Sequence, residues 1–130
     1  MASRDLQRRA QQQGAYRAAG LWPDTSLAAS FLAVAAERDG APALVDDDRT
    51  LSFRELAACV RRCAAGLEAR GVRPGEAVAY RLPNWWEAAV TLLATAALGA
   101  RSVPIVPILR AREGGQILAQ TAPRVIVTAA

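Results

Sequence analysis

Residues 81–100, RLPNWWEAAVTLLATAALGA, constrain the fold most, because they predict a helix with almost no polar side. On a helical wheel only Glu87, Thr91 and Thr95 form a narrow polar strip. The other positions make two adjacent apolar faces, one with Trp85, Ala89, Leu92 and Ala96 and one with Trp86, Val90, Leu93 and Ala97. A helix that is apolar nearly all round lies in the core of a large protein or packs on a partner. The segment therefore predicts a core helix that needs covering on more sides than a chain of 130 residues easily provides.

The same segment is too short for a membrane anchor. Its uninterrupted apolar part, residues 88–100, is thirteen residues long, whereas a membrane-spanning helix needs about twenty. The N-terminus is charged and polar and lacks the apolar stretch of a secretion signal. We therefore predict no membrane span and a cytoplasmic location.

The charged residues argue against several kinds of chemistry. All sixteen basic residues are arginine, and the chain has neither lysine nor histidine. Without lysine there is no Schiff-base chemistry, and without histidine the commonest general base and metal ligand is missing. Residues 1–20 carry four arginines against one aspartate, a net +3 of the chain's +4. This basic arm on a nearly neutral body lacks the basic stripe and interleaved aromatic residues of a nucleic-acid-binding surface, so no nucleic-acid partner is predicted.

The order of the expected elements indicates an α/β fold, with residues 1–24 as the basic arm and residues 25–130 as the folded part. The first half predicts a helix over 26–38 capped by Asp24, Thr25 or Ser26, hairpin strands at 43–45 and 50–53, and a helix from Phe53 to Gly71 with a Ser52–Glu55 capping box. The second half predicts a strand at 77–82, the apolar helix from an Asn84 cap with Glu87 three residues on to Gly99, a short or edge strand at 100–107, a weak helix at 109–122 and a strand at 124–130.

Strands and helices alternate from residue 77 onward, which predicts an incomplete, mostly parallel sheet with flanking helices. In such sheets ligands bind beyond the carboxyl ends of the strands. Here the strands end at Leu82-Pro83, Val106-Pro107 and Thr128, and none of these positions carries an obvious catalytic group.

Three groups of residues resemble sites, and each has a simpler interpretation. Cys59 and Cys63 are four positions apart without the further ligands of a zinc site, so we interpret them as small core residues. The three aspartates at 46–48 fit a solvated hairpin turn better than a metal cluster. The Gly114-Gly115 pair lacks the further glycines, lysine and preceding strand of a phosphate loop, and each glycine weakens its helix by about 1 kcal/mol.

Taken in order, the motifs resemble the start of the AMP-forming acyl-CoA synthetases and related adenylate-forming ligases. The pieces that carry the resemblance are LSFREL (51–56), GVRPGEAVAYRLPN (71–84), ALGARSVPIVP (97–107) and the closing strand RVIVT (124–128). They lie in the family's order over residues 15–130. The segments YRAAGLW (16–22) and LPNWWEA (82–88) look most like the branch that activates cyclic, medium-chain or aromatic carboxylic acids. The aryl-acid adenylating enzymes of siderophore biosynthesis share the same entry.

The resemblance implies a two-step reaction. A carboxylate attacks the α-phosphate of ATP, usually with Mg²⁺, to give an acyl-adenylate and pyrophosphate, and a thiol, commonly that of CoA, then displaces AMP. In the family the groups that hold these reactants lie downstream: a Gly/Ser/Thr-rich phosphate loop, an aromatic-acidic adenine motif, a ribose-binding aspartate and a lysine in a mobile C-terminal domain. This chain has no lysine, so the resemblance assigns it no catalytic, cofactor-binding or metal-binding residue.

Two further pairs of residues need an interpretation. Arg110 and Arg112 follow the VPIVP segment, where the family usually has a surface loop and a helix start, so we expect solvated side chains rather than phosphate ligands. For Trp85 and Trp86 we expect packing in the first helical turn rather than stacking on an acyl group or adenine.

The resulting hypothesis is an N-terminal fragment of an AMP-forming carboxylic acid:CoA ligase, inactive by itself. Its partners would be the remainder of the enzyme and a carboxylic acid substrate. Two alternatives stay open: a free-standing small α/β interaction module that dimerises or docks a separate chain, and a membrane-surface protein that uses the basic arm.

Overall fold

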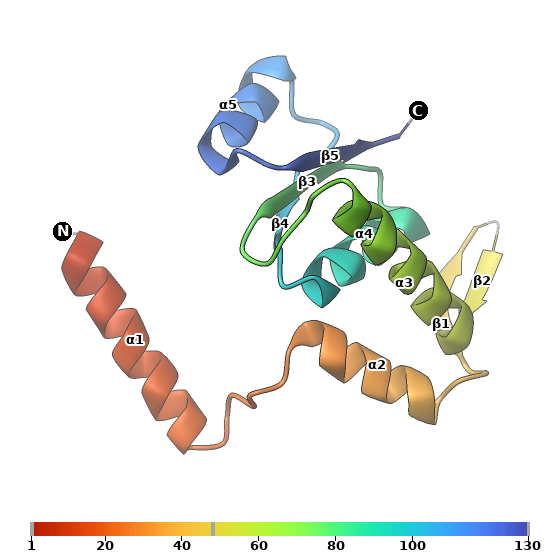
Figure 1. Cartoon of the computed structure of the whole chain (residues 1–130), viewed down its shortest axis with the longest axis horizontal. Coiled ribbons are helices and arrows are strands. Elements are labelled where there is room, and N and C mark those ends of the chain that lie inside the picture. Colours follow the sequence, from red (N-terminus) through yellow and green to blue (C-terminus); the bar gives the residue numbers. More distant parts are fainter. Residues whose placement is uncertain (1, 48, 130) are drawn as a thin grey trace.

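The computed structural model describes residues 2–47 and 49–129. Its elements are, in chain order, α1 Ala2–Ala18, α2 Leu27–Glu37, β1 Pro42–Asp46, β2 Arg49–Ser52, α3 Phe53–Ala69, β3 Ala77–Arg81, α4 Trp86–Ala97, β4 Arg101–Pro104, α5 Ala111–Thr121 and β5 Val125–Thr128. Helix α1 lies apart from the body that the other elements form (Figure 1), and all of its described side chains are exposed. A division of the chain at residue 24 stays a prediction.

The strands form two separate sheets, as the sequence predicts. β1 and β2 pair antiparallel as the expected hairpin. Of its acidic turn, Asp46 and Asp47 are described, whereas Asp48 lies outside the described residues. β4, β3 and β5 form a parallel sheet in that order, so β3 is central and β4 and β5 are the outer strands. An outer position for β4 agrees with the prediction from its prolines.

The hydrophobic core lies among α3, α4, the hairpin and the central strand (Figure 1). Successive residues of β3 are all buried until Arg81, which is typical of a strand covered on both faces. The core cluster consists of Leu51, Leu56, Val60, Leu67, Val72, Val78, Val90 and Ala94. In contrast, α5 buries none of its residues, although it continues through both glycines at 114 and 115.

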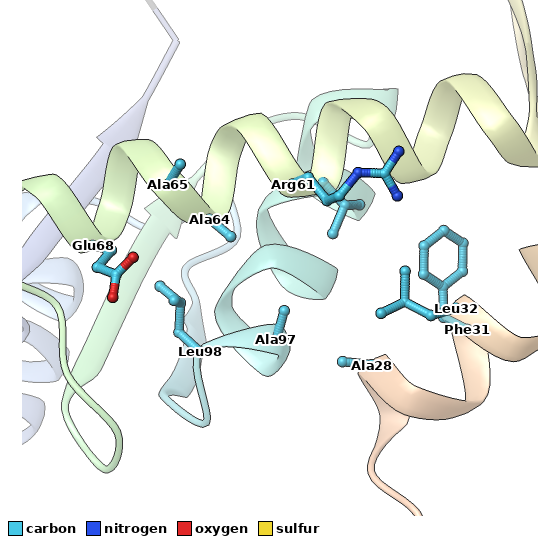
Figure 2. Close-up of a pocket in the computed structure, with 10 residues that line it drawn as sticks. Ala28, Phe31, Leu32, Arg61, Ala64, Ala65, Glu68, Ala97 and Leu98 are labelled. Atoms are coloured by element: carbon cyan, nitrogen blue, oxygen red, sulfur yellow. The ribbon is translucent and has the colours of Figure 1, made fainter.

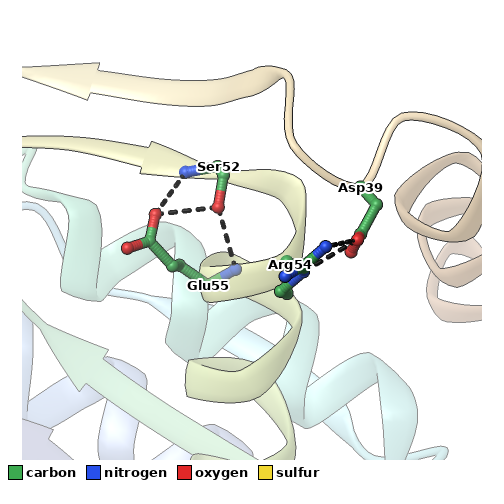
Figure 3. A network of polar contacts seen from close by, with 4 residues as sticks. All are labelled: Asp39, Ser52, Arg54 and Glu55. Atoms are coloured by element: carbon green, nitrogen blue, oxygen red, sulfur yellow. Dashed lines mark hydrogen bonds and ion pairs between the residues drawn. The ribbon is translucent and has the colours of Figure 1, made fainter.

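Local signals set both ends of α3. Ser52 and Glu55 form the predicted capping box, in which the Ser52 N–H donates to Glu55 Oε2 at 2.8 Å and the Glu55 N–H donates to Ser52 Oγ at 3.2 Å (Figure 3). The Ser52 hydroxyl also donates to Glu55 Oε2, at 2.8 Å. The bonds that the Ser52 backbone N–H and the Ser52 hydroxyl donate to the carboxylate, the backbone one first, lower the pKa of Glu55. At the other end Gly71 has a φ of +87°, the left-handed conformation that glycine adopts readily after a helix.

An ion pair next to the capping box connects α2 to α3. Arg54 donates from Nε and from a terminal nitrogen to Asp39, with Nε 2.7 Å from Asp39 Oδ2 (Figure 3). The hydrogen bond from Arg54 lowers the pKa of Asp39. The predicted N-terminal cap of α2 is present at Ser26, whose hydroxyl accepts from the Ala29 N–H at 3.1 Å.

Two of the three residues in the narrow polar strip of α4 face the interior of the protein, whereas Glu87 is half-buried. Thr91 and Thr95 are 3% and 0% exposed. Each hydroxyl donates to the carbonyl four residues earlier, Thr91 to Glu87 at 2.8 Å and Thr95 to Thr91 at 2.7 Å. Their burial therefore leaves no donor unsatisfied. Within the described part of the chain, no helix combines the length and the hydropathy that crossing a membrane requires.

Candidate functional site at the carboxyl edge of the sheet

The three parallel strands bring their carboxyl ends to one edge, which is where ligands bind in sheets of this kind. In the register of the sheet Tyr80 lies beside Pro104, and Arg81 lies beside Thr128. The segment that follows β3 and the segment that follows β4 therefore leave the sheet next to each other. This edge is the first place to look for a site.

Two mostly apolar cavities open at this edge. One, of about 300 Å³, lies between the segments that follow β3 and β4. The second, of about 390 Å³, lies between the hairpin and the start of α4. Tyr80 and Asn84 line both cavities. The edge can therefore receive an apolar group and offers it few polar contacts.

Tyr80 is the most deeply placed polar side chain here. It is 8% exposed, and it lines both cavities. Burial raises the pKa of the Tyr80 phenol. The group therefore stays protonated near neutral pH and can donate a hydrogen bond, but it is no base. The sequence analysis did not single out Tyr80, although a tyrosine in an otherwise apolar strand was a visible signal.

Arg81 positions the segment that follows β4. Its Nη2 donates to the carbonyl oxygens of Pro107 at 2.7 Å and Leu109 at 3.0 Å. Because these two bonds bridge from β3 to the neighbouring strand's exit, they fix the outer wall of the cavity. Both bonds come from Nη2, so this nitrogen of the guanidinium has a positioning role in the structure.

The start of α4 corrects one prediction. Asn84 is not the N-terminal cap, because the helix starts at Trp86 and Trp85 occupies the cap position without a side-chain hydrogen bond. The carboxylate of Asp46 replaces the local cap and accepts from the Trp86 N–H at 3.2 Å. The physical reason is the turn that Pro83 makes, whose carbonyl accepts from the Trp85 N–H at 2.7 Å and moves Asn84 out of register. The helix N-terminus is thus occupied by an anion from the chain itself.

The two tryptophans lie in different surroundings. Trp86 is half-buried against the core, and the Arg49 guanidinium lies 4.8 Å from its ring centre. Trp85 is 48% exposed. The expected packing role describes Trp86 well, whereas the structure leaves much of the Trp85 ring uncovered.

The remaining candidates do not converge on this edge. Arg110 and Arg112 are exposed at the start of α5. Cys59 and Cys63 are free thiols half-buried along α3, and burial raises the pKa of Cys63. In the described ranges 2–47 and 49–129, no three acidic or thiol side chains gather in a way that could hold a metal ion.

Together these side chains suit the binding of a mostly apolar group. The edge presents mostly apolar walls together with the Tyr80 phenol, the Asn84 amide and the Asp46 carboxylate, and this carboxylate accepts from the Trp86 N–H.

The sequence was compared with models of protein families and with known proteins. A family model described as AMP-binding enzyme matches residues 31–130. The medium-chain fatty-acid–CoA ligase of Escherichia coli (strain K12) is 35% identical over 104 residues, which are 79% of this chain and 18% of that enzyme. The salicyl-AMP ligase / salicyl-S-ArCP synthetase of Mycobacterium tuberculosis is 37% identical over 126 residues, covering 92% of this chain and 22% of that enzyme.

Among solved structures, the N-terminal subdomain of NpsA from Klebsiella oxytoca matches with a TM-score of 0.75 at 25% identity. The match covers 80% of this chain and 27% of that one. The chain therefore spans about a fifth of the length of the curated relatives it matches.

Proposed function

The chain belongs to the AMP-binding enzyme family, and from that premise we propose that it forms the N-terminal part of an ATP-dependent, AMP-forming carboxylic acid ligase. The observation that carries the proposal is the family match over residues 31–130. The parallel sheet with its carboxyl-edge cavities agrees with this assignment.

The proposed reaction has two steps. A carboxylate oxygen attacks the α-phosphorus of ATP, and the bond to the leaving pyrophosphate breaks. A thiol sulfur then attacks the acyl carbon of the adenylate, loses its proton and expels AMP. We propose CoA as the thiol, because one relative is named as a CoA ligase. The acid is a medium-chain or an aromatic carboxylic acid, because the relatives are named for both classes.

The described residues do not fit Mg²⁺, because they form no cluster of metal-ligating side chains. For the phosphates of ATP, the chain lacks a lysine of the kind that the family uses. The N-terminus of α4, which could otherwise attract a phosphate, already holds the Asp46 carboxylate. The proposal therefore assigns nucleotide binding and catalysis to residues outside this chain.

The role proposed for these 130 residues is to supply walls of the larger domain. The outer side of α4 exposes Trp85 and Leu92, at 48% and 37%. Ile126 of β5 is 50% exposed, and Ile108 beyond β4 is 88% exposed. Apolar surface of this kind fits packing against the remainder of the enzyme, which is the proposed partner. A cytoplasmic location stays a prediction of the sequence.

The experiment compares the product of the whole gene with the isolated chain. The coding DNA is read past codon 130, both proteins are expressed, and ATP–pyrophosphate exchange is measured with octanoate, benzoate and salicylate. We expect a Gly/Ser/Thr-rich loop and a late lysine downstream, exchange with the whole product and none with residues 1–130. Exchange by residues 1–130 above a mock preparation would falsify the assignment of the catalytic groups.

A second candidate is a free-standing interaction module, and the exposed outer side of α4 is the observation that favours it. A stop codon directly after codon 130, together with a stable complex between residues 1–130 and a separate chain, would support the module over the ligase.

A further inference from the structure

The outward side of α3 carries one positive and one negative side chain, Arg61 and Glu68. A second α3 running in the opposite direction would place its negative side chain opposite the positive one. Arg61 and Glu68 are seven residues apart, which is about two helical turns, so both project from one side of the helix. Ala64 and Ala65 lie between them on the same side. Arg61, Ala65 and Glu68 are exposed. The two charged side chains belong to none of the ion pairs found in residues 2–47 and 49–129.

These residues border an apolar groove of about 250 Å³ between α2, α3 and the end of α4. Figure 2 shows Arg61 and Glu68 on α3 at the border of this groove, with Phe31 and Leu32 on α2 and Leu98 at the end of α4. Leu32 is 41% exposed. A helix that binds this surface needs small or apolar side chains between an anionic and a cationic side chain. Its anionic side chain must lie opposite Arg61 and its cationic side chain opposite Glu68.

A second copy of this chain provides that order, and we propose that α3 packs antiparallel against α3 of a second copy around a two-fold axis between Ala64 and Ala65. The axis places residues whose numbers sum to 129 opposite each other. Arg61 then faces the second copy's Glu68, Glu68 faces its Arg61, and Ala64 faces its Ala65. A two-fold interface repeats each contact, so one complementary pair gives two ion pairs. Alanines at the crossing let the two helix axes approach closely.

The expected dimer is weak and depends on salt. Stable interfaces bury about 800 Å² on each partner, more than two turns of one helix and a neighbouring leucine provide. Exposed ion pairs contribute little singly, and salt screens them. The association therefore weakens at high ionic strength and discriminates sharply between the two signs of charge.

The test is a charge exchange, read by sedimentation equilibrium of residues 1–130 at low salt and at about 1 M salt, where the screening length is about 3 Å. Arg61→Glu and Glu68→Arg each convert two attractive contacts into two repulsive ones. We expect each to weaken the dimer by roughly tenfold at low salt. The double variant Arg61→Glu/Glu68→Arg restores complementarity, so we expect the dissociation constant of the unaltered chain to return.

Two further variants control for charge and for folding. Arg112→Glu makes the same charge change on exposed α5, and we expect it to leave the dimer unchanged. Ala65→Trp places a large side chain at the crossing point, so we expect it to weaken the dimer. Circular dichroism melting shows whether each variant is folded. A monomer at all concentrations, single exchanges without effect, or a double exchange that restores nothing overturns the proposal. Association through the uncovered side of α4 would ignore these signs of charge and so also counts against it. None of these outcomes bears on the proposed ligase function.

Discussion

Helices α3 and α4 pack against each other in one core, yet they begin in different ways. The first turn of α3 is held by Glu55 within that turn and by Ser52, the residue directly before the helix. The first turn of α4 is held by Asp46, forty residues earlier in the chain. The start of α3 is therefore specified locally, whereas the start of α4 depends on the hairpin being in place.

The two helices also differ in which side they bury. In α3 the apolar Leu56, Val60 and Leu67 are inside, as in an ordinary amphipathic helix. In α4 the two threonines are inside, whereas Trp85 and Leu92 on the other side are 48% and 37% exposed. The apolar side of α3 is therefore covered within these 130 residues, whereas the outer side of α4 is suited to further packing.

The largest effect is expected when the same truncation, leucine to alanine, is made on the buried side of α3 and on the outer side of α4. Leu67→Ala removes a side chain that is 4% exposed, and we expect it to lower the free energy of unfolding by about 3 kcal/mol. Leu92→Ala acts at a position that is 37% exposed, so we expect less than about 1 kcal/mol. Urea denaturation followed by circular dichroism measures both. Equal losses would mean that the outer side of α4 is as well packed as the inner side of α3.

A smaller effect tests the distant cap of α4. Asp46→Ala removes the acceptor of the Trp86 N–H and also that of the Asp47 N–H, which lies 2.8 Å from Oδ1. We expect a loss of about 1 kcal/mol in unfolding free energy. Asn84→Ala is the matched control and should change stability by less than about 0.5 kcal/mol. The reverse ranking would return the cap to Asn84 and contradict the observed geometry.

The same contrast explains how much could be predicted from the sequence. Caps and stops formed by neighbouring residues, such as the Ser52–Glu55 box and Gly71, were predicted because their partners are adjacent in the chain. The alternation of strands and helices was enough for the parallel sheet. The cap of α4 was predicted wrongly, because no local pattern reveals that a hairpin carboxylate reaches its first turn.

The candidate site shows the same limit. Strand exits could be placed from the sequence, and with them the edge where the cavities lie. The place of Tyr80 between the two cavities and the bridge from Arg81 to Pro107 and Leu109 depend on how neighbouring strands align, which only the three-dimensional register reveals. The inward orientation of Thr91 and Thr95 was likewise hidden, because hydrogen bonds within the helix make buried threonine acceptable.

The smallest expected effect tests whether the start of α3 is held by a charge. Hydrogen bonds from Ser52 favour the ionised form of Glu55, so the pKa of this carboxyl group is lower in the folded chain than in the unfolded chain. The unfolded chain therefore binds the proton more readily, and the stabilisation is complete above the unfolded pKa and disappears as pH falls through the folded pKa. Glu55→Gln cannot titrate, so we expect it to be less stable than the unaltered chain at about pH 7, with the difference shrinking toward about pH 3.

Urea denaturation across this pH range measures that difference. Asp39→Asn is the control, because the pKa of Asp39 is also lowered, by its hydrogen bond from Arg54. Its own loss should shrink in the same direction, and the two losses need not add because Arg54 and Glu55 are adjacent. A difference for Glu55→Gln that stays constant with pH would mean that the capping box acts through its shape alone. The local start of α3 would then owe nothing to ionisation, and the contrast with the carboxylate-held start of α4 would be sharper than the structure alone indicates.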